Sequence, residues 1–328
     1  MGIAEVLDNE STGECAPSKD EVFSRFTAAL LGSGPTTANE LSDADEMLYH
    51  RIAATIEMED KLVDHIPSRP TVLLELLAEL EKEETDFTRI QKIVAEDVGL
   101  IGEILRISNS PLYLTRSGEV TSLEKAVALL GFNGVMKVAS TVVVRNVVDV
   151  DNCHYSQQLK KLWAYCLQSG ESCQILGNSE NSFMHYLLGL IHEIGSVSII
   201  SLALEHLRDE INSNANDMLV IRRLMMERSA WLSSLVAAEW GMPENYLLVL
   251  NEFDRLRKGQ MDEDEYSFCA PSTKVLEVGS LAAQSYNLLR NHSLDEKEGT
   301  LFLQSLGLDE KQKEKLFTRL DLAQATVS

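Results

Sequence analysis

Residues 121–131 run Thr-Ser-Leu-Glu-Lys-Ala-Val-Ala-Leu-Leu-Gly, and this stretch decides the class of fold. Thr121 followed three positions later by Glu124 predicts a capping box, in which the two side chains satisfy backbone N–H groups at a helix start. The apolar residues that follow give the helix a face to bury, and Gly131 favours the left-handed conformation that commonly ends a helix. The stretch therefore predicts a short amphipathic helix with both ends marked.

Similar signals recur on both sides of this stretch. Ser42 predicts an N-cap for a helix that extends to about His65. Pro67 and Pro70 bracket a turn, after which Thr71 predicts the start of a helix with leucines on one face. Further helices are predicted over residues 20–31, 155–176, 183–207, 217–228, 230–240, 243–255, 272–289, 297–306 and 309–320.

One β-branched run, Ser140–Val144, could form a strand on propensity alone. We predict helix there, because the sequence offers no hairpin signal and no partner strand. The fold class is therefore all-α, a compact multi-helix bundle with helical extensions at both ends. We divide the chain into an N-terminal tail with a short helix, partly mobile (1–42), a main helical domain (43–257) and a C-terminal helical extension (258–328).

The charge of the chain argues against nucleic acid and membrane partners. The 328 residues include 29 Lys and Arg against 51 Asp and Glu, a net charge of −22. Such a field repels phosphate backbones and anionic lipid headgroups, and it favours solubility or basic protein surfaces as partners. The 45% of apolar residues suffice for a sizeable core.

Cysteine usage and the N-terminus indicate a cytoplasmic protein. Five cysteines without a CxxC pair are typical of reduced thiols. The first residues lack the basic start and apolar core of a signal peptide. No uninterrupted apolar run approaches the ~20 residues of a membrane span, since His192 and Glu193 interrupt the longest.

Two blocks of sequence resemble the HDOD family, a degenerate, non-catalytic relative of the HD-domain phosphohydrolases. Residues 104–113, Ile-Leu-Arg-Ile-Ser-Asn-Ser-Pro-Leu-Tyr, together with 120–131, are similar to the family's Asn-Ser-x-x-Tyr turn and the capped helix that follows it. Residues 188–195, Leu-Gly-Leu-Ile-His-Glu-Ile-Gly, are similar to the Gly-Leu-Leu-His-Asp-Ile-Gly segment of HD proteins. Trp163 and the segment 240–243, Trp-Gly-Met-Pro, support the resemblance, which extends over about residues 60–255.

The resemblance implies that the metal site of the HD enzymes has been lost. Tyr165 stands where a histidine is expected, and His192-Glu193 replaces the His-Asp pair. Ser229 stands where many relatives keep another histidine. The implied site is vestigial, with no catalytic residue, no bound metal and no cofactor. From the residue types alone, we expect His192 to be an ordinary core histidine hydrogen-bonded to a backbone carbonyl, and metal binding is the alternative.

The first block carries a second group of candidate residues, Asn109, Ser110 and Tyr113. An Asn-Ser pair before a proline is typical of a helix-ending turn with side-chain caps, and it could also line a ligand pocket. Cys166 and Cys173 lie seven positions apart on one helix face; buried structural cysteines are the expectation, and a redox pair or soft-metal site is the alternative.

The resemblance implies a non-enzymatic bacterial signalling or regulatory protein that acts by binding other signalling proteins. One alternative is a divergent metal-dependent HD phosphohydrolase that uses His192 and Glu193. Another is a nucleotide-sensing module that uses the vestigial pocket. A DNA-binding helix-turn-helix over residues 97–109 is disfavoured, because Arg106 is nearly the only cation there.

Overall fold

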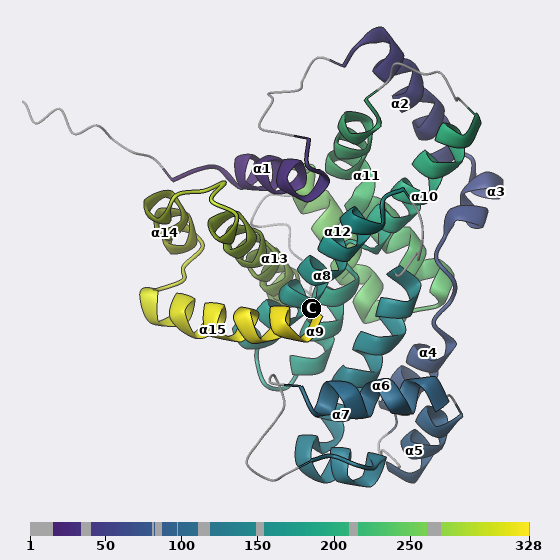
Figure 1. Ribbon diagram of the computed structural model, residues 1–328, viewed down its shortest axis with the longest axis vertical. Helices are drawn as coiled ribbons and strands as arrows, with labels where there is room; N and C mark the ends of the chain where they lie inside the picture. The colour runs from purple at the N-terminus through teal and green to yellow at the C-terminus, as the bar shows by residue number, and fades with distance from the viewer. Residues whose placement is uncertain are drawn as a thin grey trace, which may run out of the picture.

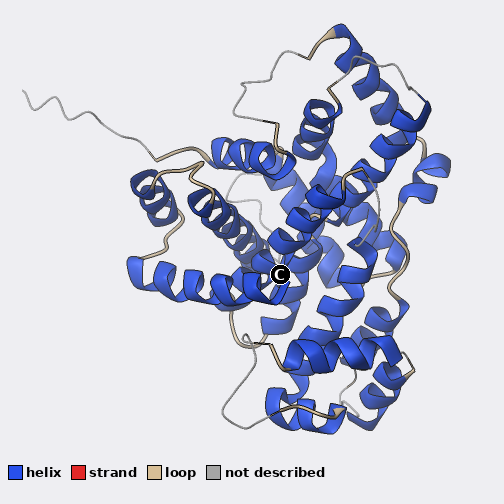
Figure 2. Cartoon of the chain, viewed as in Figure 1, coloured by secondary structure: helices blue, strands red, loops and turns tan. Residues whose placement is uncertain are grey.

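The computed structural model describes residues 16–33, 41–80, 82, 87–96, 98–110, 119–148, 154–209, 216–260 and 270–327. Within these ranges the chain forms helices joined by turns, with no strand (Figure 2). The all-α prediction is confirmed. Residues 1–15 and 34–40 of the predicted N-terminal segment, the motif residue Tyr113 and the cysteines Cys15, Cys153 and Cys269 lie outside the described residues.

The helices follow one another along the chain (Figure 1). The first half contains α1 (Lys19–Leu31), α2 (Asp43–Ile56), α3 (Glu59–Leu62), the 3-10 turn η1 (Val63–His65), α4 (Thr71–Leu80), α5 (Phe87–Ala95), α6 (Val98–Ser108) and α7 (Leu123–Val148). The second half contains α8 (Ser156–Leu176), α9 (Ser182–Ile191), α10 (Ile194–Asp209), α11 (Asp217–Trp240), α12 (Glu244–Arg257), α13 (Ala270–Arg290), α14 (Glu296–Ser305) and α15 (Glu310–Val327).

Ser42 caps α2 as its sequence predicts. Its Oγ accepts a hydrogen bond from the backbone N–H of Asp45 at 3.2 Å, and the Asp45 carboxylate accepts one from the N–H of Ser42 at 2.9 Å. The prediction that this helix continues to His65 is wrong. The chain turns after Ile56, so that Ile56 and Leu62 are both buried, whereas one continuous helix would point these two side chains about 120° apart.

The cap of α7 lies one residue later than predicted. Ser122, not Thr121, accepts from the backbone N–H of the third helical residue, Lys125, at 3.2 Å. Gly131 ends the first helical segment with φ 69°, as predicted, and a second segment begins directly after it. The β-branched run is helical as predicted, and Thr141 donates its hydroxyl proton to the carbonyl of Lys137 at 2.7 Å.

Two boundaries in the second half differ from the prediction. The stretch predicted as one helix over 183–207 is divided at His192 and Glu193 into α9 and α10. The stretches predicted as separate helices, 217–228 and 230–240, form the single helix α11, which contains Ser229 without a break. The serine is buried in this helix, and no glycine or proline interrupts the chain there.

Helix α8 lies at the centre and packs chiefly against α9 and α13. In Figure 1, α4 to α7 lie at one end of the protein. Helices α13 and α15 pack against α8, α14 packs against these two, and α1 lies next to α13. One apolar cluster extends from Val22 in α1 to Ala323 in α15. The extensions at both ends therefore share the core of the main domain.

In the part of the chain that the structure describes, two stretches are long and apolar enough to cross a membrane by length and composition alone, Leu123–Val148 and Ser182–His206. The sequence predicts no membrane span, because His192 and Glu193 interrupt its longest apolar run, but the mean hydropathy of the second stretch is high in spite of this interruption. Of the most apolar 18 residues in each stretch, 50% are buried inside the protein in Leu123–Val148 and 89% in Ser182–His206. Burial in a helical core accounts for their composition.

Glycine allows α8 and α9 to approach closely. A Cβ atom on Gly189 would lie 2.6 Å from the carbonyl oxygen of Ser169, a distance that no repacking of side chains relieves. We expect Gly189→Ala to lower the free energy of unfolding by about 1–3 kcal/mol, because backbone must move apart. Chemical denaturation followed by circular dichroism measures this change.

Gly102 in α6 is the matched control. Nothing lies within 4 Å of a Cβ added there, and the residue is exposed. Gly102→Ala is expected to stabilise the protein by about 0.4–1 kcal/mol, since it only restricts the unfolded chain. Equal effects at the two positions would contradict close packing of α8 on α9.

Candidate functional site

The His192-Glu193 pair lies at the junction of α9 and α10. His192 caps the C-terminus of α9, and α10 begins at Ile194. Consecutive residues within one helix diverge by about a hundred degrees, but this junction buries both side chains, with 0% of His192 and 2% of Glu193 exposed. The pair therefore lies inside the protein.

Both ring nitrogens of His192 are engaged. The Nδ1 atom lies 2.8 Å from the carbonyl oxygen of Gly189, which can only accept, so the proton is on Nδ1. The Nε2 atom then accepts from the Tyr165 hydroxyl at 3.0 Å, and this hydroxyl accepts from Nε2 of Gln284 at 2.9 Å. Burial lowers the pKa of His192, which keeps the ring neutral at pH 7.

Aromatic rings surround this hydrogen-bonded chain. The Phe26 ring of α1 lies 4.4 Å from the Tyr165 ring, and the Phe253 ring of α12 lies 5.8 Å from the His192 ring, centroid to centroid. Burial raises the pKa of Tyr165, and the charge of Glu193 raises it further. The phenol therefore stays protonated and donates to His192.

An arginine binds the carboxylate of Glu193. Its Oε1 atom accepts from Nη1 of Arg257 at 2.9 Å, and its Oε2 atom accepts from the Ser196 hydroxyl at 2.7 Å. The same Nη1 atom lies 3.2 Å from the Ser229 hydroxyl. The Arg257 guanidinium also lies over the Phe23 ring, 3.9 Å from its centroid.

The structure thus brings together all four residues of the implied vestigial site. Tyr165 contacts His192, and Arg257 joins Glu193 to Ser229. Sequence reasoning missed Arg257 and Gln284, which complete the two halves of the network. Arg257 lies one helical turn beyond Phe253, so a systematic check of that face of α12 could have identified it.

These residues do not fit a divalent metal such as the HD enzymes use. A metal would need lone pairs of His192 and Glu193, and both ring nitrogens and both carboxylate oxygens already have hydrogen-bond partners. The positive charge beside Glu193 is that of Arg257, which would repel a cation. Among the described residues, no group of three or more His, Cys, Asp or Glu side chains could hold a metal ion.

The motif residue Asn109 holds the chain at the end of α6. Its Nδ2 atom donates to the carbonyls of Leu105 and Val120, both at 2.8 Å, and its Oδ1 atom accepts from the N–H of Val120 at 2.9 Å. Ser110 follows in the turn, and none of these hydrogen bonds reaches His192. Asn109 therefore acts on the backbone between α6 and α7.

The two described cysteines, Cys166 and Cys173, are buried in α8 and free. Burial raises the pKa of both thiols, which keeps them protonated. Neither has the thiolate character that redox chemistry or a soft metal requires. Their surroundings match the structural role expected from the sequence.

Known structures share this fold at low sequence identity. One is a protein from Shewanella amazonensis SB2B provisionally named a metal-dependent phosphohydrolase (TM-score 0.62, 16% identity, covering 86% of this chain and 100% of that one). Another is an HDOD domain protein of unknown function from Geobacter sulfurreducens (TM-score 0.58, 16% identity, covering 85% of this chain and 97% of that one). A third, from Marinobacter aquaeolei VT8, is provisionally named a signal transduction protein (TM-score 0.53, 17% identity, covering 92% of this chain and 67% of that one).

Sequence comparison gives a curated relative and a family. An uncharacterised protein of Treponema pallidum (strain Nichols) is 24% identical over 190 residues, which are 56% of this chain and 36% of the relative. The chain thus matches about a third of that relative's length. The profile of the HDOD domain matches residues 66–254, which is more than half of the chain. By this match, and by the helical fold around His192, the chain belongs to the HDOD family.

Proposed function

We propose that this chain is a non-catalytic bacterial signalling module that acts by binding other proteins. The observation that carries the proposal is the position of Arg257, whose guanidinium lies between Glu193 and Ser229. The positive charge of Arg257 neutralises Glu193, the acid of the implied vestigial site. Hydrolysis of a phosphate ester would need an activated water at this place, and no free donor set remains to hold a metal that activates it.

The surroundings of the site support binding over chemistry. His192 is fully buried, neutral and hydrogen-bonded on both sides, so it cannot exchange protons with a substrate. Helices α1 and α13, which flank the family match, supply the residues Phe26 and Gln284 that close over it. The net charge of −22 favours signalling partners with basic surfaces over nucleic acid. The name of the Marinobacter structure adds the signalling role by analogy.

We expect the purified full chain to hydrolyse neither cyclic dinucleotides, nucleoside phosphates nor bis(p-nitrophenyl) phosphate with Mg²⁺, Mn²⁺, Fe²⁺ or Zn²⁺. Product formation should equal that of buffer, and metal analysis should find far less than one equivalent. Turnover that His192→Ala abolishes would overturn the proposal and establish a divergent phosphohydrolase. His185→Ala is the control, since His185 is equally buried but bonds to Ser272 outside the site.

Partner binding tests the positive half of the proposal. Affinity capture from the source bacterium with the full chain, followed by mass spectrometry, should retain defined signalling proteins. The variant Glu193→Gln should retain the same proteins, because the proposal places binding on the surface. Failure of the folded chain to retain any protein above a heat-denatured control, in repeated captures, would contradict it.

A further inference from the structure

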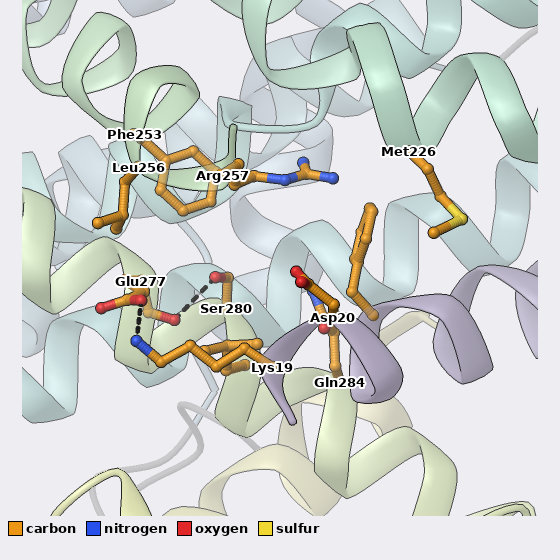
Figure 3. Close-up of a pocket in the computed structure, with 11 residues that line it drawn as sticks. Lys19, Asp20, Met226, Phe253, Leu256, Arg257, Glu277, Ser280 and Gln284 are labelled. Carbon is orange, nitrogen blue, oxygen red and sulfur yellow. Dashed lines mark hydrogen bonds and ion pairs between the residues drawn. The ribbon is translucent and has the colours of Figure 1, made fainter. Parts of the chain in front are cut away.

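Helix α1 lines two cavities that differ in charge. The first part of α1 borders a cavity of about 320 Å³ beside the His192 network, and each cation of that cavity has an acidic partner. Lys19 forms an ion pair with Glu277, as Figure 3 shows. Arg257 is paired with Glu193. The last part of α1 borders a second cavity of about 300 Å³, which α8, α13 and α15 also line.

Among the described residues that line it, the second cavity has two cations and no acid. Its polar lining consists of Lys160 and Lys161 of α8, Asn287 and Asn291 of α13 and Gln324 of α15. No ion pair of the described residues includes either lysine. In a chain with a net charge of −22, this cavity is a local reversal of sign. Acids farther away than about 8 Å are largely screened at physiological ionic strength, so they do not cancel it.

The ammonium group of Lys161 lies at the wall of the second cavity. Its Nζ atom is 3.3 Å and 3.4 Å from the carbonyl oxygens of Ala29 and Leu30, which both line the cavity. Hydrogen bonds of this length are weak, and an ammonium group has three donors. Lys161 therefore keeps its charge and at least one donor for a ligand. Lys160, the next residue in the chain, is exposed and adds a second positive charge.

The carboxamides of the lining suit hydroxyl groups. Nδ2 of Asn287 donates to Oε1 of Gln168 at 2.6 Å and to the carbonyl of Ala283 at 2.8 Å, so Oδ1 is the atom left to bind a ligand. Asn291 lies one turn farther along α13 and is exposed, with a donor and an acceptor to offer. A hydroxyl group both donates and accepts, so it can pair with either side chain.

The lining offers no aromatic surface on which a flat ring could stack. Phe26 is its one aromatic residue among those described. This side chain is only 5% exposed, and its ring lies 4.4 Å from the Tyr165 ring, centroid to centroid. Stacking on an aromatic side chain contributes about 1–3 kcal/mol to the binding of a nucleic acid base. The second cavity therefore favours a ligand without a base.

We propose that the second cavity binds a sugar phosphate. A phosphate monoester carries a charge of about −1.5 to −2 at pH 7, which Lys160 and Lys161 together balance. The sugar hydroxyls would pair with Asn287 and Asn291. The volume of the cavity is at the lower end of the range for small-molecule sites. This goes beyond the proposed function, because it gives the interaction module a small-molecule input at α1, α13 and α15, which lie outside the family match.

Isothermal titration of the full chain at physiological ionic strength tests the proposal. The compounds are glucose 6-phosphate, fructose 6-phosphate and ribose 5-phosphate, each compared with its parent sugar and with inorganic phosphate. We expect at least one sugar phosphate to bind about tenfold more tightly than either control, since each control lacks one half of the contacts. If none does, or if adenosine monophosphate binds more tightly than all three, the proposal is wrong.

Substitutions at exposed positions locate the site. Lys160→Gln should weaken binding of the sugar phosphate about tenfold, whereas Lys125→Gln, which removes the same charge from an exposed position outside the lining, should not. Asn291→Ala should weaken binding of the sugar phosphate but not of inorganic phosphate. Equal binding by the two lysine variants would place the ligand elsewhere and overturn the inference. None of these results depends on protein partners or on hydrolysis, so the proposed function is tested separately.

Discussion

Replacing Arg257 by methionine is expected to lower the free energy of unfolding by about 3 kcal/mol. Methionine keeps much of the contact with Phe23, but it leaves the Glu193 carboxylate buried without its cation. The ionised acid then loses its charged partner, and only the Ser196 hydroxyl still donates to it. Urea denaturation at pH 7, followed by circular dichroism, measures the loss.

A second substitution distinguishes the lost ion pair from lost packing. Adding Glu193→Gln to the methionine variant removes the buried charge and should restore most of the stability. Arg228→Met is the surface control, because Arg228 pairs with Glu57, which is 64% exposed, and such pairs contribute about 0–1 kcal/mol. If Glu193→Gln restores nothing, the cost comes from packing and not from the charge.

Replacing Lys137 by methionine is expected to cost about 4 kcal/mol. Lys137 of α7 lies 2.7 Å from the Glu171 carboxylate of α8, and neither side chain is more than 4% exposed. Arg319 of α15 donates to the other carboxylate oxygen at 2.9 Å but is itself 30% exposed. Arg319 alone cannot replace the buried partner. Thermal and urea unfolding of the two proteins measure the difference.

The same pair predicts a dependence on acid. Burial raises the pKa of Glu171, but the charges of Lys137 and Arg319 outweigh this effect and hold it below the ordinary value. The unfolded chain therefore binds a proton at higher pH than the folded protein, and stability falls as the pH drops below about 4.3. The variant with methionine at both Lys137 and Glu171 should be near wild type in stability at pH 7 and lose less between pH 5 and 3. An equal loss would contradict the assignment.

Local signals predicted where most helices begin and end. Ser42 and Gly131 act through backbone groups within one turn of themselves, so their sequence context is sufficient. The break at His192 could not be predicted in this way, because the nearest glycines, Gly189 and Gly195, each lie three residues away from it. Burial of Glu193 beside Arg257 favours the turn. Long-range contacts decide such boundaries.

The candidate site was predictable only where it follows the family pattern. The resemblance identified Tyr165 and His192. In the fold, the Tyr165 hydroxyl oxygen lies 3.0 Å from Nε2 of His192. Gln284 contacts Tyr165 from α13, 119 positions later in the chain and outside the family match. No periodicity or motif in that helix distinguishes Gln284 from a surface glutamine. Its role depends entirely on how α13 packs against α8.

The pairing of α1 with α13 bears on how the chain is made. Lys19 bonds to Glu277, 258 positions later, and α1 forms one wall of the cavity beside the site. A ribosome adds about 5–20 residues per second, so α1 emerges about 13 to 50 seconds before its partner exists. Throughout that interval the apolar face around Phe26 has no cover from α13. Although α1 is made early, it can therefore complete its packing only after α13 has been made.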